Sequence, residues 1–392
     1  MGGSLFFGLG AFFAPIQLEY RWSFSVLSGA FALQYFVMGV AAFLFGWFFD
    51  RFHPAWLAVF GIAVTGLSFA ALSLVKSTLG LYAVFAAMGV GGSAATSLLF
   101  NSLVALWFTR SLGLGLAVMQ TGFAVGGLTA AGFVGLINSV GWRASAVLVG
   151  AGILVIGLPL CPAIRLPGSA KALRTKTKEN RSGTPTHDQS PIWPEGGLGL
   201  SATLRTTAFW VIVAVIALSS AVTQAVYAHQ IRAMLTFGIP AAVAGLAAGV
   251  TGIVGLTGRY GFGLLAERIN SRNLLAAALL LQGVGTALLA RASAGNSILW
   301  FVILFGIGQS GIFVLSPVLQ RDYFGTRDFG TIQGLIMGPS LILSAVGPLA
   351  VGVAVDAVHS YRPALLIAGG LAASLAGLVF VARRKSWSEG LE

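Results

Sequence analysis

The sequence contains few charged residues, and this scarcity argues against a soluble protein before any motif is considered. Asp, Glu, Lys and Arg together make up 9% of the 392 residues, whereas a soluble domain carries about 25%. The 23 basic residues are scattered between apolar stretches, so the net charge of +12 does not indicate a nucleic-acid surface. We therefore expect a lipid bilayer, and no nucleic acid, among its partners.

Motifs for disulfide bonding, phosphate binding, metal binding or catalysis are also absent or rare. The single cysteine, Cys161, excludes a disulfide within the chain. We find no phosphate-binding loop of the Walker type, no cluster with metal-ligand spacing and no plausible nucleophile–base pair. Accordingly we expect no cofactor and no metal, and we predict that the protein is not an enzyme. The first residues also lack the basic region of a cleavable signal peptide.

Long apolar runs are what the sequence has in abundance, with 57% hydrophobic residues. A helix that crosses a bilayer needs about 20 such residues, and apolar runs near that length recur along the chain. We predict an all-α membrane protein with twelve transmembrane helices, at 4–17, 24–49, 54–75, 79–108, 112–137, 144–161, 207–231, 241–266, 274–290, 297–319, 331–354 and 363–381.

A polar, basic stretch separates the sixth and seventh spans. Residues 165–206 are rich in Ser, Thr, Pro and Gly with interspersed Lys and Arg, a composition typical of a flexible linker. The predicted domains are therefore an N-terminal six-helix bundle at 1–164, this linker, a C-terminal six-helix bundle at 207–382 and a tail at 383–392. Sixteen of the 23 basic residues fall on the side that holds both termini and the linker, and six fall on the other side. Because basic loops stay inside, we expect both termini to be cytoplasmic, in the cell inner membrane.

The two halves repeat one another. Gly46-Trp-Phe-Phe-Asp-Arg51 follows the second span, and Gly263-Leu-Leu-Ala-Glu-Arg268 follows the eighth, 217 residues later. The endings Thr109-Arg110 and Thr326-Arg327 have the same offset, and Arg143 and Arg362 lie 219 residues apart. Such a repeat predicts two pseudo-symmetric bundles with a substrate site between them near the membrane midplane.

This layout and the paired loop motif resemble the major facilitator superfamily, over essentially the whole chain. Within it, the sequence resembles the group of monocarboxylate transporters and oxalate:formate antiporters. The resemblance is carried by Gly141-Trp-Arg143, by Tyr323-Phe-Gly325 with Phe329-Gly330 and Gly334, and by an arginine in the eighth span, Arg259. In that group this arginine holds the substrate carboxylate, which makes Arg259 the expected carboxylate ligand.

Arg259 also stands out without the resemblance. No other charged residue occurs between Arg232 and Glu267, and a charge inside a membrane is costly and marks a functional site by default. No acidic residue is expected in the middle of a span, so Arg259 lacks an obvious counter-ion. The alternative is a structural role, in which Arg259 neutralises a buried acidic residue. The resemblance implies that a dicarboxylate carrier has a second basic residue in the eleventh span. Residues 331–354 contain neither Lys nor Arg, so we favour a substrate with a single negative charge.

Uncharged polar residues inside the spans complete the predicted substrate site. We expect contributions from His229, Tyr227, Gln224, Gln120, Asn101 and Gln309, although residues of this kind more often join helices to one another. The loop residues Asp50, Arg51, Glu267 and Arg268 are predicted to act in conformational gating, by capping helix ends and forming ion pairs between the halves.

The function predicted from the sequence is secondary active transport of a small monocarboxylate, such as lactate or pyruvate, by alternating access. Proton coupling is expected from the resemblance, although the lysine of the first span and the acid before Arg259 that proton-coupled carriers show are missing. We expect a monomer. The alternative on the same fold is an exporter or exchanger of other organic anions or drugs. A membrane enzyme or sensor is disfavoured, because no appended domain or catalytic cluster is visible.

Overall fold

The computed structural model describes residues 9–95, 97–108, 111–164, 197–292 and 296–382, without the side chains of residues 24, 97 and 123–131. Within these ranges the regular elements are helices, and no strand occurs. The N-terminal half contains η2 (Leu9–Phe12), α1 (Phe13–Tyr20), α2 (Phe24–Arg51), α3 (Pro54–Leu72), α4 (Thr78–Ala95), α5 (Ser97–Trp107), α6 (Leu112–Leu160) and η3 (Cys161–Ala163).

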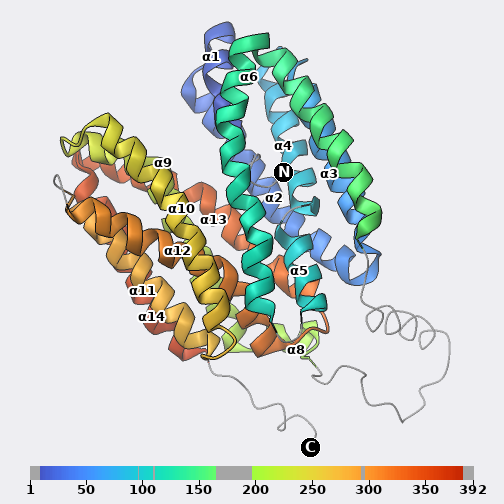
Figure 1. The fold of residues 1–392 in the computed structure, drawn as a ribbon, viewed down its shortest axis with the longest axis vertical. Coiled ribbons are helices and arrows are strands. Elements are labelled where there is room, and N and C mark those ends of the chain that lie inside the picture. The colour runs from blue at the N-terminus through green and yellow to red at the C-terminus, as the bar shows by residue number, and fades with distance from the viewer. Residues whose placement is uncertain (1–8, 96, 109–110, 165–196, 293–295, 383–392) are drawn as a thin grey trace, which may run out of the picture.

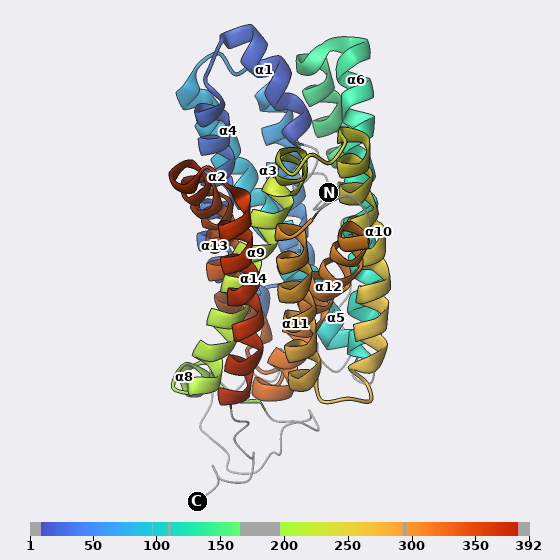
Figure 2. The same ribbon diagram turned by 90° about the vertical axis from the view of Figure 1, so that its left-hand side faces the viewer.

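The C-terminal half begins with a short helix and continues with six long ones. These are α8 (Leu200–Leu204), α9 (Thr207–Thr236), α10 (Ala241–Leu265), α11 (Ser271–Ala290), α12 (Asn296–Phe324), α13 (Phe329–Val358) and α14 (Tyr361–Leu378), followed by η4 (Val379–Val381). The two halves form two bundles that lie side by side in Figure 1, and in Figure 2 the C-terminal bundle lies in front of the N-terminal one.

Ten helical stretches among the described residues are long and apolar enough to cross a membrane. Three predicted spans differ from the rest. The first is described only from Leu9, and the fifth and sixth run together as α6, which is interrupted at Gly141 with φ 80° and ψ 160°. Only glycine adopts this backbone conformation without strain, so Gly141 is where one span turns into the next. Residue 96, between α4 and α5, lies outside the description.

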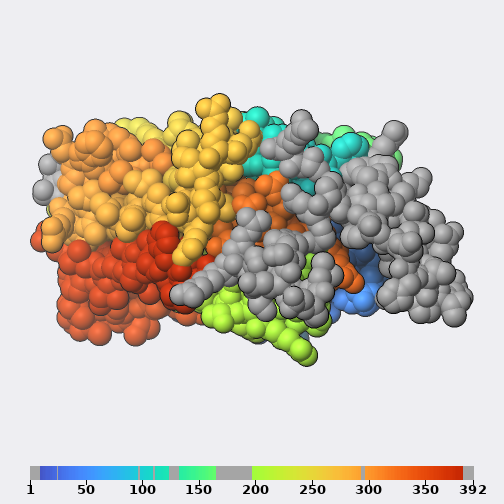
Figure 3. Space-filling view, turned by 90° about the horizontal axis from the view of Figure 1, so that it is seen from below, coloured from blue at the N-terminus to red at the C-terminus, as the bar shows by residue number. Residues whose placement is uncertain are grey.

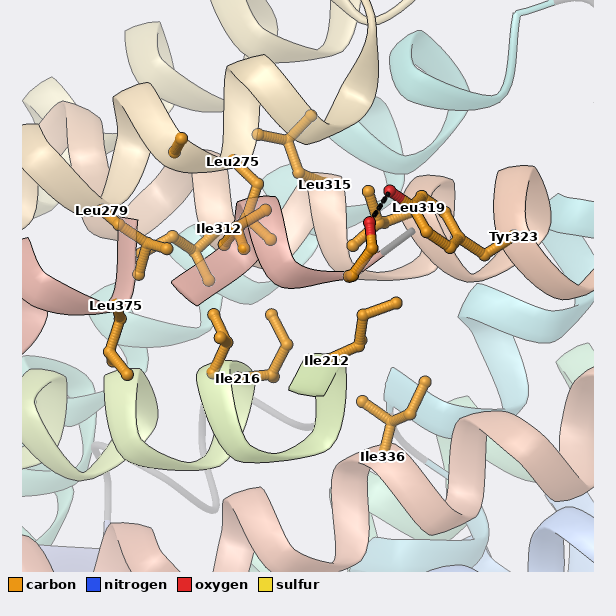
Figure 4. Packing of buried hydrophobic residues seen from close by; sticks show 14 of the residues in the cluster. Ile212, Ile216, Leu275, Leu279, Ile312, Leu315, Leu319, Tyr323, Ile336 and Leu375 are labelled. Carbon is orange, nitrogen blue, oxygen red and sulfur yellow. Dashed lines mark hydrogen bonds between the residues drawn. The ribbon is translucent and has the colours of Figure 1, made fainter. Parts of the chain in front are cut away.

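Each bundle has its own apolar core. In the C-terminal bundle, buried side chains from five helices interdigitate, as Figure 4 shows for Ile212 and Ile216 of α9, Leu275 and Leu279 of α11, Leu315 and Leu319 of α12, Ile336 of α13 and Leu375 of α14. A matching cluster in the N-terminal bundle includes Phe12, Phe69 and Phe85. Since each core is built within one bundle, each bundle can move as a unit.

The bundles meet mainly through two helix pairs, α2 with α13 and α6 with α10, with smaller contacts of α5 with α12 and α13 and of α6 with α12. Both meetings lie towards one end, which we call the linker end and which holds residues 51–54, 197–207, 265–271 and 324–329. Glycines allow the close approach. A Cβ added to Gly263 would lie 2.6 Å from the carbonyl oxygen of Gly113, and one added to Gly46 would overlap the carbonyl of Gly330. At this end the α8 segment, lime green in Figure 3, packs against α9 of the C-terminal bundle.

Candidate functional site

Arg259 lies where the two bundles meet. It occupies α10 six residues before that helix ends, about 9 Å from the linker end at 1.5 Å per residue, and its exposed fraction is 7%. The guanidinium Nη1 donates to the backbone carbonyl of Gln120 in α6, at 2.8 Å. In turn the Gln120 amide Nε2 donates to the carbonyl of Phe313 in α12, at 3.2 Å. The predicted pair Arg259 and Gln120 is therefore brought together across the two bundles.

The charge of Arg259 has no carboxylate partner among the described residues. Their ion pairs join Arg143 to Glu19 and Arg321 to Asp322. The Nε of Arg259 is buried and finds no acceptor there either. A buried guanidinium with an unused donor is an unfavourable arrangement that an anionic group would relieve, because a planar carboxylate can accept two parallel hydrogen bonds from it.

Two further predicted residues lie near Arg259. The phenol of Tyr227 in α9 is close enough to Arg259 to interact with it electrostatically, and its ring packs edge-to-face on Phe305 at 5.7 Å. Gln309 of α12 lies against Gly255, one turn before Arg259, and its Nε2 donates to the Ser310 hydroxyl at 2.7 Å. Arg259, Gln120, Tyr227 and Gln309 thus form one polar neighbourhood contributed by α6, α9, α10 and α12.

The other three predicted residues make different contacts. Gln224 donates to the Tyr35 hydroxyl of α2 at 3.0 Å, which joins the two bundles. The His229 ring nitrogen Nε2 lies 2.9 Å from the Pro348 carbonyl, within the C-terminal bundle. Asn101 is buried on α5, and its Oδ1 has no partner among the described residues. These placements leave their roles in substrate binding as predictions.

One contact at the site was missed by the sequence reading. The Tyr260 hydroxyl lies 2.9 Å from the Thr121 hydroxyl, across the two bundles and next to Arg259 in the chain. No local pattern links residues 139 positions apart, so only the packing of α10 against α6 reveals the pair.

Apolar side chains close the linker end beneath Arg259. One group from both bundles, which we call the gate cluster, comprises Ala105, Leu112, Leu116, Ala117, Val314, Val318 and Phe329. A second group, the middle cluster, comprises Tyr35, Met38, Ala42, Leu98 and Leu341. Because both clusters draw residues from both bundles, they must come apart before the linker end can open.

The predicted gating residues fall into two kinds. Asp50 accepts hydrogen bonds from the Gly330 and Thr331 amides, at 2.9 and 2.7 Å, and from the Thr331 hydroxyl at 2.6 Å. Its carboxylate thus caps α13 of the other bundle, where free amides and the helix dipole favour negative charge. Arg51 stacks on Trp47 at 4.0 Å, whereas Glu267 and Arg268 are exposed. None of these four forms an ion pair with a described residue, and the contact between the halves that the described residues show here is the Asp50 cap.

Comparisons with known proteins agree with this architecture. A model of the Major Facilitator Superfamily matches residues 2–303 and 230–391. The uncharacterized MFS-type transporter YcxA of Bacillus subtilis (strain 168) is 21% identical over 364 residues, covering 89% of this chain and 84% of that protein.

Two solved structures share the fold. The E. coli fucose:proton symporter FucP superposes with a TM-score of 0.68 at 15% identity, over 98% of this chain and 97% of that one. The human organic anion transporter MFSD10 superposes with a TM-score of 0.65 at 18% identity, over 91% and 83%. Together with the ten membrane-length helices in two bundles, they confirm the predicted fold class. Because the family model matches nearly every residue, the chain belongs to the major facilitator superfamily, and it is an integral membrane transporter of small molecules rather than an enzyme.

Proposed function

We propose that this protein is a secondary active transporter of small monocarboxylates, such as lactate or pyruvate, in which Arg259 holds the substrate carboxylate. The observation that carries the proposal is the state of Arg259. It is buried between the two bundles, bonds a backbone carbonyl and has no acidic partner among the described residues. A permanently charged group in this position is costly, and a small anion offsets that cost.

The number of cations near the site supports a substrate with one carboxylate. Helix α13 contains neither Lys nor Arg, and the basic residues of α9 and α12 lie near the ends of those helices, at Arg232 and Arg321. A dicarboxylate would leave its second charge without a partner at this depth, so one guanidinium suits one carboxylate.

The contacts between the bundles support alternating access. The gate cluster and Asp50 close the linker end, Arg259 lies next to the gate cluster, and the middle cluster joins the bundles farther from that end. In our proposal a substrate reaches Arg259 from the opposite end, neutralises it and lets the bundles rock so that the linker end opens. A proton accompanies the substrate.

The orientation follows from the basic residues. We propose that the linker end faces the cytoplasm, in the cell inner membrane, because it holds most of the Lys and Arg. The proposed functional units are the bundles 1–164 and 207–382, acting in one monomer, with the linker 165–206 and the tail 383–392 on the cytoplasmic side.

Replacing Arg259 tests the carboxylate site. In proteoliposomes, Arg259→Ala should lower the kcat/KM of labelled lactate uptake by at least about thirtyfold, because losing one partner of a buried charge pair costs about 2 kcal/mol or more. Arg259→Lys should keep part of the activity, since an ammonium retains the charge without the two-pronged geometry. Arg291→Ala, at the exposed end of α11, is the matched control and should transport normally.

Unchanged lactate transport by Arg259→Ala would rule out the carboxylate site. A panel of larger organic anions and drugs, assayed in the same vesicles, tests the alternative that the protein exports or exchanges such compounds. That alternative fits the fold shared with a human organic anion transporter, and it predicts transport of bulky substrates with little dependence on Arg259.

A further inference from the structure

Three buried polar side chains lie inside the closed linker end without hydrogen-bond partners. They are Asn101 and Ser102 on α5 and Gln333 on α13, with exposed fractions of 4%, 0% and 1%. The Oδ1 of Asn101, the Oγ of Ser102 and the Oε1 of Gln333 bond no described residue. We call them the joint residues, because they lie between the two clusters that close this end.

The helical spacing establishes that position. On α5, Leu98 belongs to the middle cluster and Ala105 to the gate cluster, so Asn101 and Ser102 lie between these two contacts. On α13, Phe329 belongs to the gate cluster, while Gln333 follows one turn later and Leu341 of the middle cluster lies two turns beyond it. Since α5 contacts α13 across the two bundles, the joint residues lie at the interface that must separate.

An unpaired buried acceptor is expensive, whereas the same group in water is fully hydrogen-bonded. Burial in the closed state stabilises the apolar residues on either side, whereas burial without a hydrogen-bond partner makes the closed state less favourable for the joint residues. We propose that the joint residues limit the stability of the closed linker end, and that their hydration when the bundles separate speeds the opening step of the transport cycle.

Buried polar residues elsewhere among the described residues are of two kinds: some, such as Thr65 and Gln230, also carry an oxygen without a partner, whereas others are bonded. Gln282 of α11 uses its Oε1 to accept from the Ser219 hydroxyl at 2.9 Å, and its Nε2 donates to Thr223 at 2.8 Å. All three lie inside the C-terminal bundle, which does not open. What distinguishes the joint residues is their position at the interface that must separate, and the bonded residues inside the C-terminal bundle supply the controls.

The test measures how often the linker end opens, without any substrate, so its failure is distinct from failure of the proposed function. In a Cys161→Ala background, Val318→Cys places one thiol in the gate cluster, where it is 1% exposed. The rate at which a water-soluble maleimide labels this thiol in nanodiscs reports opening. We expect Gln333→Leu and Ser102→Ala each to slow labelling by about fivefold or more, because each removes an unpaired group from the closed state.

Gln282→Leu and Ser219→Ala are the matched controls, since they remove buried groups that are bonded. They should lower the thermal stability and leave the labelling rate within about twofold of the parent. A slower rate in the Gln333 and Ser102 variants, with normal rates in the controls, supports the proposal. Unchanged or faster labelling in both joint variants would overturn it, because it would mean that these groups are already satisfied when the linker end is closed.

Discussion

The Asp50 carboxylate forms three hydrogen bonds with the first turn of α13, and these join the two bundles. Glu267 occupies the equivalent place in the second half, 217 residues later. By the repeat it would cap the start of α6, yet it is exposed and forms no ion pair with a described residue. The two repeat-related acids are therefore unequal, and Asp50 carries the contact that favours closure.

This inequality leads to a prediction for single residues. Asp50→Asn should speed labelling of the Val318→Cys thiol by about fivefold or more, because hydrogen bonds to a charged group are stronger than those to a neutral amide. Glu267→Gln, which makes the same chemical change in the other half, should alter the rate by less than about twofold. Equal effects of the two variants would contradict the asymmetry.

At the scale of helices, an arginine fixes α1 against the second part of α6 at the end opposite the linker. Arg143 donates to Glu19 at 2.5 Å and to the Tyr20 hydroxyl at 2.6 Å, and Trp142 donates to Glu19 at 2.8 Å. The other half repeats part of this arrangement, with Arg362 over the ring of Phe237 at 5.3 Å. Phe237 is the repeat counterpart of Tyr20, whereas Glu19 corresponds to Thr236, so only the N-terminal bundle carries the acid.

The Glu19 contact should depend on pH. Hydrogen bonds from Arg143 and Trp142 lower the pKa of the Glu19 carboxyl. Its contribution to stability is therefore present above the ordinary carboxyl pKa of about 4.3 and is lost as the pH falls through the lower folded-state pKa. We expect the Tm of Glu19→Gln to be about 1–2 °C below the parent at pH 7, and we expect this gap to close as the pH falls below the ordinary carboxyl pKa.

Thermal melts in detergent across this pH range measure the effect. Glu267→Gln is the control for pH dependence, because Glu267 is exposed and makes no ion pair with a described residue. A Tm gap for Glu19→Gln that does not change as the carboxylates are titrated would show that the ionised carboxylate is not what stabilises this end.

At the scale of the whole molecule, two bundles with separate cores touch mainly through two repeat-related helix pairs, α2 with α13 and α6 with α10. Close glycine contacts bring the helices together at the linker end in both pairs. An interface built on packing and few hydrogen bonds can separate without breaking either core, which is what rocking of two rigid bodies requires.

Proton coupling is a property of the full cycle and is tested on the intact protein. If a proton accompanies each carboxylate, an inward proton gradient should concentrate labelled lactate in proteoliposomes, and a protonophore should abolish the accumulation. Substrate-driven alkalinisation of the outside medium, followed with a pH-sensitive dye, is the independent readout. Accumulation that persists after the gradient collapses would exclude the proton as the coupling ion.

Much of the fold was predictable from the sequence, for a physical reason. A bilayer requires about 20 apolar residues per helix and penalises isolated charges, so span positions, the repeat and the exceptional Arg259 are visible in the order of residues alone. The structure adds detail that local patterns do not predict, such as the sharp backbone turn at Gly141 between the fifth and sixth spans, with φ 80° and ψ 160°.

The sequence by itself determined the helices, the two halves and the one cation inside the membrane, because these depend on local polarity. Only the tertiary structure decided which side chains meet. It placed Gln120 against Arg259, paired Thr121 with Tyr260 and buried Gln333 without a partner. These relations join residues far apart in the chain through the packing of one bundle on the other, and no local pattern of apolar and polar residues encodes them.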